Sequence, residues 1–357
     1  MRSVLITGGA GFIGANFVHY WLREYPTDRV VVLDALTYAG HRASLAALED
    51  DPNFRFVHGD IGDESLVEAI LRRERIDTLV HFAAESHVDR SIHGPDAFIQ
   101  TNILGTHSLL KATKRVWLDD KPPANPVLFH HVSTDEVYGS LGPNDPPSRE
   151  TTPYAPNSPY AASKAASDHL VRAYHHTHGL PVTTSNCSNN YGPYQFPEKF
   201  IPHMLINALT GLALPIYGDG RNIRDWLYVE DHCRGIDLVI RHGRRGESYN
   251  IGGHNEQRNI DLVHDLCTEL DRRLGQDPAL AARFPDCPAA QGLSCTELIT
   301  FVADRKGHDW RYAIDPSKCQ RELGYRPRAG FASGLKKTLD WYLANEAWWR
   351  GVLAGRC

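Results

Sequence analysis

Residues 3–14 read SVLITGGAGFIG, and this stretch determines the fold expected for the first half of the chain. Its apolar start, Val4–Ile6, predicts a buried strand, and a helix is expected over Ile13–Glu24. The glycines between them fit both G-x-x-G-x-x-G and G-x-G-x-x-G: Gly8, Gly9, Gly11 and Gly14. A strand, a tight glycine turn and a helix in this order are typical of a dinucleotide-binding loop, because the bare backbone and the helix N-terminus approach a pyrophosphate.

An acidic residue at the end of the second predicted strand supports this interpretation. Asp34 stands 20 residues after Gly14. A carboxylate at this place accepts a hydrogen bond from a ribose 2′-hydroxyl and repels a 2′-phosphate, which favours NAD over NADP. Asp60 and Ile61 follow the third strand and are placed either to contact adenine or to form a simple turn.

Strands and helices alternate through the first half of the chain. Further strands are expected over residues 30–33, 54–57, 78–81, 126–133 (its apolar part 127–132) and 181–185, and helices over 64–73, 98–115 and 158–176. This order predicts an α/β fold, a Rossmann-type doubly wound parallel sheet with right-handed crossovers. The sequence thus predicts an NAD-binding domain over residues 1–190.

After about Asn186 the alternation is lost, and Pro and Gly become frequent. Helices are expected over 201–210, 259–274 and 334–344, and short strands over 227–229 and 248–251. We expect residues 191–357 to form mainly a smaller α/β C-terminal substrate-binding domain, with a segment of about 220–252 returning to the first domain. The Pro- and Ala-rich stretch 275–294 is expected to be a surface excursion.

Composition excludes several classes of protein. The 357 residues are 42% hydrophobic and 23% charged, with a formal net charge of −5, so no basic surface for nucleic acid is expected. No apolar run is long enough for a membrane span, and no secretory signal is recognisable. Seven scattered cysteines without a C-x-x-C pair favour free thiols in a reducing cytoplasm, although Cys287 and Cys295 are close enough in sequence to pair.

Tyr160 and Lys164 are the first candidates for chemistry. Their spacing of four puts both on one face of the helix after the fifth strand. A nearby ammonium is expected to lower the pKa of the phenol, so that Tyr160 acts as a base toward an alcohol, and Lys164 is also placed to bind the nicotinamide ribose. The pattern alone is common, and its place behind a complete dinucleotide-binding half carries the interpretation.

Thr134, Asp135 and Glu136 follow the fifth strand, at the edge where α/β sheets bind ligands. Two adjacent acids are usually a solvated turn. Inside a low-dielectric site, however, two carboxyls tend to separate their pKa values, so that one serves as general acid and the other as base. The sequence therefore predicts a redox site that also eliminates water.

Basic residues of the second half are candidates for neutralising a diphosphate: Lys199, Arg221, Arg224, Arg305 and His308. The run 189–193 is interpreted either as a binder of sugar hydroxyls or as a turn. No metal-ligand spacing is found among the histidines, so no metal is expected.

Ten segments then resemble the extended short-chain dehydrogenase/reductase family, and within it the dTDP-glucose 4,6-dehydratases. They are TGGAGFIG (7–14), DALTYAG (34–40), HGDI (58–61), HFAAESHVDRS (81–91), VSTDEVYG (132–139), YAASK (160–164), NCSNNYGPYQFPEKFIP (186–202), PIYGDGRNIRDWLYVEDH (215–232), YNIGGHNE (249–256) and DRKGHDWRYAID (304–315). The resemblance runs nearly end to end and is specific as a set.

The resemblance implies dehydration of dTDP-glucose to dTDP-4-keto-6-deoxy-glucose with NAD as a retained cofactor. Tyr160 would take the proton of the sugar 4-hydroxyl, Glu136 would remove the proton of C5, and Asp135 would protonate the departing 6-hydroxyl. Thr134 would hydrogen-bond near O4. The family also implies a homodimer to which the helix carrying Tyr160 contributes.

The binding residues implied by the resemblance form two sets. Cofactor contacts are expected from Gly8, Gly11, Phe12, Ile13, Gly14, Asp34, Ala35, Leu36, Thr37, Asp60, Ile61, Phe82, Ala83, Ala84, Ser86, Thr101, Tyr160, Lys164 and Asn190. Substrate contacts are expected from Ser86, Thr134, Asn189, Lys199, Phe200, Pro215, Ile216, Tyr217, Arg224, Asn250, Asp304, Arg305, Lys306, Gly307 and His308.

Two departures from the family pattern are Phe200, where leucine is often found, and Lys306, where proline is common. The excursion from Ala282 to Ser294 is longer than in many members. The rival interpretations are another nucleotide-sugar 4,6-dehydratase, a 4-epimerase or decarboxylase of the same family, which lacks the adjacent acids, and a non-catalytic NAD-binding regulator. The nucleotide base is implied by resemblance alone.

Overall fold

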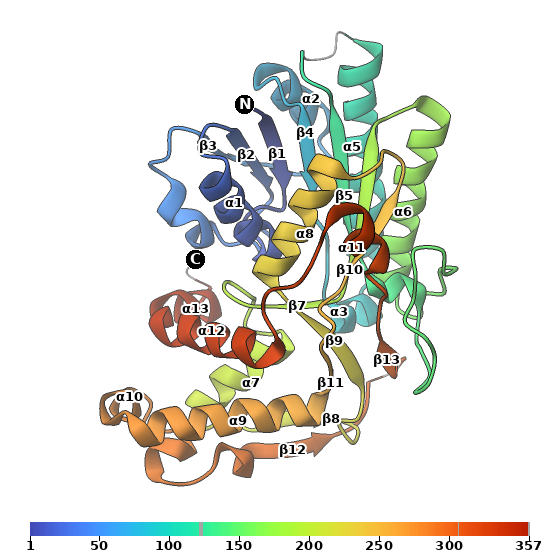
Figure 1. Ribbon diagram of the computed structural model, residues 1–357. Coiled ribbons are helices and arrows are strands. Elements are labelled where there is room, and N and C mark those ends of the chain that lie inside the picture. Colours follow the sequence, from blue (N-terminus) through green and yellow to red (C-terminus); the bar gives the residue numbers. More distant parts are fainter. Residues whose placement is uncertain (121–123, 306, 356–357) are drawn as a thin grey trace.

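A seven-stranded parallel sheet forms the upper part of the molecule in the computed structural model, which describes residues 1–120, 124–305 and 307–355 (Figure 1). Its strand order is β10-β6-β5-β4-β1-β2-β3. The strands are β1 (Ser3–Thr7), β2 (Arg29–Asp34), β3 (Phe54–His58), β4 (Thr78–His81), β5 (Leu128–Thr134), β6 (Val182–Cys187) and β10 (Ser248–Ile251). Every pair in it is parallel, so the predicted doubly wound α/β fold is confirmed.

Side chains of the sheet alternate between two helical layers, as a buried parallel sheet requires. In β1, Val4 and Ile6 join the apolar cluster on one face, while Leu5 joins the cluster on the other. The first face is covered by α1 (Phe12–Glu24) and α8 (Val229–His242). The opposite face is covered by α2 (Glu64–Arg73), α5 (Thr106–Lys114) and α6 (Pro159–His178). The apolar runs read from sequence are therefore covered on both sides.

The lower part in Figure 1 has its own apolar core. Around it lie α7 (Phe200–Leu209), α9 (Asn259–Gln276), α10 (Pro278–Arg283), α12 (Phe331–Ala344) and α13 (Glu346–Leu353). Two small sheets complete it: β8 (Leu214–Tyr217) pairs with β12 (Ile299–Val302), and β9 (Ile223–Tyr228) pairs with β7 (Asn189–Tyr191), β11 (Glu256–Arg258) and β13 (Arg311–Tyr312). Trp349 is buried in this core.

Short helical segments connect these elements. They are η1 (Arg42–Leu48), α3 (Val88–His93), α4 (Asp96–Phe98), η2 (Ile99–Gly105), η3 (Arg115–Asp119), η4 (Asp135–Tyr138), η5 (Pro288–Gln291), η6 (Cys295–Leu298) and α11 (Ser317–Leu323). Among the described residues, no helix combines the length and apolar character that crossing a bilayer demands.

The structure corrects several predicted elements. The single helix expected over 98–115 extends from Asp96 to Asp119 and contains the wide π-helical turns η2 and η3. The strand expected over 227–229 is the longer β9. The run 189–193, interpreted either as a binder of sugar hydroxyls or as a turn, begins with strand β7. These strands pair with partners far away in sequence, which no local pattern reports.

The expected surface excursion is also wrong in part. Phe284, Cys287 and Ala289 are buried in the C-terminal core. Pro and Ala dominate the local composition and conceal these apolar anchors. Cys287 and Cys295 are free thiols whose sulfur atoms lie 3.6 Å apart.

Two helical glycines provide a test of the packing at the first turn of α1. A Cβ on Gly14 would lie 2.2 Å from the carbonyl oxygen of Gly8, whereas a Cβ on Gly275 meets nothing within 4 Å. We expect Gly14→Ala to lower the free energy of unfolding by about 1–3 kcal/mol, because backbone must move. The control Gly275→Ala should raise it by up to about 1 kcal/mol, through helix propensity. Chemical denaturation of the two variants measures this, and equal effects would contradict the clash.

Candidate active site

A cavity of about 310 Å³ lies at the carboxyl ends of β2, β4, β5 and β6. All the residues predicted to contact a dinucleotide line it, except Leu36, whose side chain packs against an apolar cluster. The cavity is adjacent to the point where β1 separates β2 from β4, the place where doubly wound sheets bind nucleotides. Sequence positions spread from Gly8 to Asn190 thus meet in one place.

The glycine loop and Asp34 shape one end of this cavity. The first turn of α1 fits so closely on the loop that the Cα hydrogen of Gly14 faces the backbone of Gly8. Asp34 Oδ2 accepts from the backbone N–H of Ala10 (2.9 Å) and Oδ1 from that of Leu36 (2.8 Å), which ties the second strand to the loop. Burial raises the pKa of Asp34, and these two bonds oppose that rise.

Buried polar atoms with no partner in the protein line the same cavity: Asp135 Oδ2, Asn189 Oδ1 and Gln195 Oε1. Such atoms are rare in folded proteins, and a polar ligand is one of the few things that explains several in one place. Together with the glycine loop and the ribose-facing carboxylate, they fit a dinucleotide with a polar second ligand beside it.

Tyr160 and Lys164 project from α6 toward the end of β5. Ser158 caps this helix by accepting from the N–H of Ala161, and Pro159 follows it in the first turn, so the helix starts at a defined residue. Lys164 Nζ donates to the carbonyl oxygen of Val132 (2.8 Å). This bond fixes one turn of α6 against the strand that carries the two acids.

The expected lowering of the Tyr160 pKa is not found. Burial raises it well above its usual value, with Glu136 adding to the rise, while a hydrogen bond with Thr134 opposes it. Lys164 does not offset this, because its ammonium is directed to the Val132 carbonyl. The protonated phenol form of Tyr160 is therefore favoured in this structure.

Asp135 and Glu136 form the first turn of η4, directly after β5. Burial is the main cause that raises the pKa of each. For Asp135 the rise is the stronger one, and the charges of Glu136 and Asp225 add to it. For Glu136, Arg224 and Lys199 oppose the rise. The pKa of Asp135 is thus raised more strongly than the pKa of Glu136. This order suits Asp135 as the proton donor and Glu136 as the base.

Cationic groups approach these acids from the second half of the chain. Lys199 Nζ donates to the carbonyl oxygen of Ser86 (2.8 Å), which bridges the two parts of the molecule. Arg224 is buried, lies over the Tyr312 ring at 4.4 Å and donates to the carbonyl oxygens of Ile223 (2.8 Å), Asp309 (3.0 Å) and Trp310 (3.4 Å).

Two more cationic candidates lie close by. Arg305 forms an ion pair with Asp89 at 2.6 Å. His308 pairs with Asp304 at 2.7 Å, and its ring lies against that of Tyr217. Arg305 and His308 thus already bind carboxylates, and a diphosphate would compete with these carboxylates for the two side chains.

Other predicted substrate residues lie elsewhere. Asn250 is fully buried, and its side chain forms hydrogen bonds with Tyr138, Ser148 and Asp315. Ile216 belongs to the C-terminal core, and Phe200 stacks on Trp226. Arg221 is exposed and pairs with Asp219. Pro215 and Gly307 are described but do not line the cavity, and Lys306 lies outside the described residues.

Several lining residues were missed from the sequence: Tyr38, Gly40, Glu85, Cys187, Gln195 and Phe196. Tyr38 and Gly40 stand inside the quoted DALTYAG stretch, so the resemblance contained a signal for them. Gln195 and Phe196 stand inside the quoted segment 186–202, on the loop after β7, and the fold brings this loop to the cavity.

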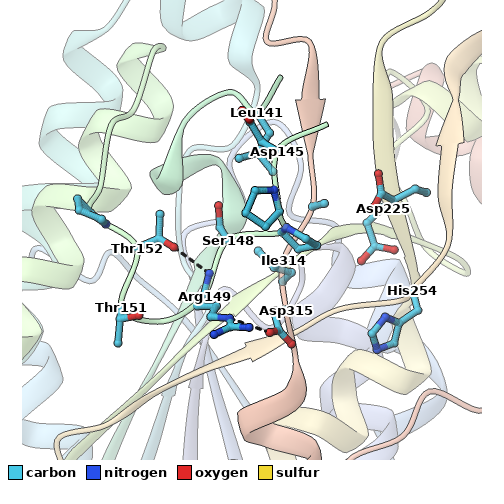
Figure 2. A pocket seen from close by; sticks show the side chains of 15 residues that line it. Leu141, Asp145, Ser148, Arg149, Thr151, Thr152, Asp225, His254, Ile314 and Asp315 are labelled. Carbon is cyan, nitrogen blue, oxygen red and sulfur yellow. Dashed lines mark hydrogen bonds and ion pairs between the residues drawn. The ribbon is translucent and has the colours of Figure 1, made fainter. Parts of the chain in front are cut away.

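A second cavity of about 900 Å³ lies apart from the reaction site (Figure 2). None of the predicted site residues lines it. Its carboxylates are held within the protein: Asp315 pairs with Arg149, as the figure shows, and Asp225 accepts from Gly253 N–H. In the described part of the chain, no group of three or more His, Cys, Asp or Glu side chains is arranged to hold a metal ion.

Comparisons with known proteins agree with this geometry. The family model GDP-mannose 4,6 dehydratase matches residues 5–338. The dTDP-glucose 4,6-dehydratase of Neisseria meningitidis serogroup B is 52% identical, over 99% of this chain and 97% of its own length. That of Escherichia coli K12 is 51% identical, over 99% and 96%.

Solved structures show the same fold. A dTDP-glucose 4,6-dehydratase from Streptomyces venezuelae, crystallised with NAD, has a TM-score of 0.86 at 48% identity, covering 98% of this chain and 100% of its own. A UDP-glucose 4-epimerase from Thermotoga maritima reaches 0.81 at 26% identity, covering 97% and 100%. The sheet is therefore common to both activities. The dehydratases named above are about half identical to this chain over nearly its whole length, so the chain belongs to the dTDP-glucose 4,6-dehydratase family of extended short-chain dehydrogenases/reductases.

Proposed function

We propose that the protein dehydrates dTDP-glucose to dTDP-4-keto-6-deoxy-glucose, by transient oxidation at C4, elimination of water across C5 and C6, and hydride return to C6. The observation that carries the proposal is the presence of the buried Asp135 and the half-buried Glu136 in the cavity that also contains Tyr160 and Lys164. A hydride-transfer pair alone suits a dehydrogenase or an epimerase. An adjacent acid and base add the means to remove water.

When bound, NAD⁺ would supply a hydride acceptor for C4, a hydride donor for C6 and the positive charge of its nicotinamide ring. We propose that the residues of the glycine loop, Asp34 and the ends of β3 and β4 hold it. Tyr160 receives the proton of the 4-hydroxyl once its own pKa is lowered by positive charge, and Thr134 hydrogen-bonds near O4. In the Tyr160–Lys164 pair, Lys164 provides a positive charge that its hydrogen bond to the Val132 carbonyl holds in place.

Elimination is assigned to the acid pair. The 4-keto group acidifies the C5–H bond, and Glu136 removes that proton, because Arg224 and Lys199 favour its ionised form. Asp135 protonates the departing 6-hydroxyl, since its burial and the neighbouring carboxylate favour the protonated form. When the hydride adds at C6, Glu136 returns its proton to C5. The stronger rise of the Asp135 pKa thus makes Asp135 the better proton donor of the pair and Glu136 the better base.

The substrate diphosphate is assigned to Lys199, Arg224, Arg305 and His308. These groups come from the C-terminal part. Lys199, Arg224 and Arg305 oppose the rise of the Glu136 pKa, and Arg224 and Arg305 lower the pKa of His308. We assign residues 1–190 to the NAD-binding domain and 191–357 mainly to the nucleotide-sugar-binding domain. The return of about 220–252 is supported by α8 packing with α1 and by β10 pairing with β6.

We also propose a homodimer and a cytoplasmic location. Ile99 and Leu104 of η2 are exposed apolar side chains next to α6, which suits a helical interface. The cysteines of the described part are all free thiols, which suits a reducing compartment. A light-scattering mass near the 40.0 kDa of one chain would contradict the dimer, and cell fractionation tests the location.

The first prediction concerns the product. Incubation with dTDP-glucose should yield a 4-keto-6-deoxy sugar, detected by its absorbance in alkali, without added NAD being consumed. UDP-, CDP- and GDP-glucose assayed in parallel test the choice of base, for which the family is the only support. Recovery of a C4 epimer alone would refute the dehydratase and favour the epimerase of the same fold.

The second prediction separates oxidation from elimination. Glu136→Gln keeps the volume of the side chain and removes the base, so NADH should form in a single turnover while product formation falls by about 10²-fold or more. Tyr160→Phe should instead suppress NADH formation itself. Stopped-flow absorbance in the NADH band distinguishes them. Unchanged product formation by Glu136→Gln would show that Glu136 is not the base that removes the C5 proton.

The third prediction concerns stability. The folded-state pKa of Asp135 lies well above the unfolded value of 3.8, so ionisation disfavours the folded state above pH 3.8. Asp135→Asn should match the wild type near pH 3–4 and become more stable as pH rises, by more than about 1 kcal/mol at pH 7.

Denaturant unfolding at both pH values, without nucleotide, measures this. Asp219→Asn is the control, because that carboxylate is 61% exposed and has no burial penalty. An Asp135→Asn variant no more stable than the wild type at pH 7 would contradict the burial argument.

A further inference from the structure

The helix that carries Tyr160 and Lys164 presents a third buried polar side chain toward β5. Asp168 follows Lys164 by four residues, about one turn of α6, and its side chain is 5% exposed. It does not line the reaction cavity. A carboxylate so deeply buried is costly unless it is well paired, and the reaction described above gives it no task.

Both oxygens of Asp168 accept hydrogen bonds from the end of β5. Oδ1 accepts from His131 Nε2 (3.0 Å), and Oδ2 accepts from Ser133 Oγ (2.8 Å). Between these two residues, the Val132 carbonyl oxygen accepts from Lys164. Three successive residues of β5 are therefore tied to one turn of α6, immediately before the strand delivers Thr134, Asp135 and Glu136.

A second path leads from Asp168 to the same place. Tyr154 OH donates to Oδ2 (2.9 Å) and accepts a longer bond from Asn186 Nδ2 (3.4 Å). That amide also donates to the carbonyl oxygen of Thr134 (3.2 Å). The Asp168 carboxylate thus accepts the hydrogen bonds of a network that contacts residues 131–134, immediately before Asp135 and Glu136.

His131 does not neutralise Asp168. Burial lowers the pKa of His131, and the nearby Lys164 lowers it further. The neutral ring carries its proton on Nε2, toward Asp168, which agrees with the lack of a partner for Nδ1.

The groups that face Lys164 come from four elements. They are Asp168 on α6, His131 on β5, His81 on β4 and Cys187 on β6. Burial lowers the pKa of Lys164, and Asp168 is the main group that opposes this. Asp168 is thus the carboxylate that supports the buried ammonium.

We propose that Asp168 is a positioning residue for the dehydratase reaction: it holds the end of β5 against α6 and keeps Lys164 charged. This inference rests on the proposed function for its consequence in catalysis, although the charge on Lys164 is measurable without substrate. Asp168 touches neither substrate nor cofactor and acts through Lys164 and the backbone of residues 131–134.

The first test is a nuclear magnetic resonance titration of the NAD-loaded protein with ¹³Cε-labelled lysine, in which Lys164→Arg assigns the signal. Asp168→Asn retains the shape and removes the charge, so the Lys164 midpoint should fall by about one pH unit. Tyr154→Phe is the matched control, since it removes one donor to Asp168 and leaves both charges. An unchanged midpoint in Asp168→Asn, or the same fall in the control, overturns the proposal.

The second test covers an Asp168→Asn chain that does not fold. Asp168→Glu retains the charge and displaces the carboxylate by one methylene, so single-turnover NADH formation should fall by about 10-fold at every pH while the Lys164 midpoint stays in place. Wild-type rates in this variant overturn the positioning role. A wild-type protein inactive on dTDP-glucose counts against the proposed function alone, because the titration still decides on Asp168.

Discussion

The burial of ionisable groups at the carboxyl end of β5 is the constraint on which the rest of the site depends. Asp135, Lys164 and Asp168 are each nearly excluded from water. Charges there interact strongly, because little solvent screens them. The protein holds this arrangement in a parallel sheet in which β5 pairs with β4 and β6 and helices cover both faces.

The same constraint explains how one scaffold supports different reactions. The overall fold is shared with a UDP-glucose 4-epimerase at a TM-score of 0.81. In this chain, two adjacent acids follow the end of β5. Since a fold does not imply a function, the acid pair and its surroundings carry the assignment. Burial favours the protonated form of Asp135, and the cations of the C-terminal part favour the ionised form of Glu136.

Much of the site was predictable because its residues follow strands in order along the chain. The glycine loop follows β1, Asp34 ends β2, and the acid pair follows β5, so the rule for parallel sheets brings them to one edge. The pKa of Tyr160 was predicted in the wrong direction, because sequence spacing gives the distance to Lys164 and not the acceptor that its ammonium selects, the carbonyl of Val132. Asn250 was expected to contact the substrate because its motif matched. In the structure its side chain forms hydrogen bonds with Tyr138 and Ser148 within the protein.

By itself, the amino-acid sequence determined the parallel α/β class, the dinucleotide loop and the pairing of a hydride-transfer dyad with two acids. These are encoded in local spacing, in which apolar runs, glycines and turns report on their own neighbourhood. Only the tertiary structure decided which cations oppose the charge of Glu136, which strands of the C-terminal part pair, and that Asp168 supports Lys164. Those outcomes depend on contacts between residues far apart in the chain and on burial, which sets the strength of every charge in the site.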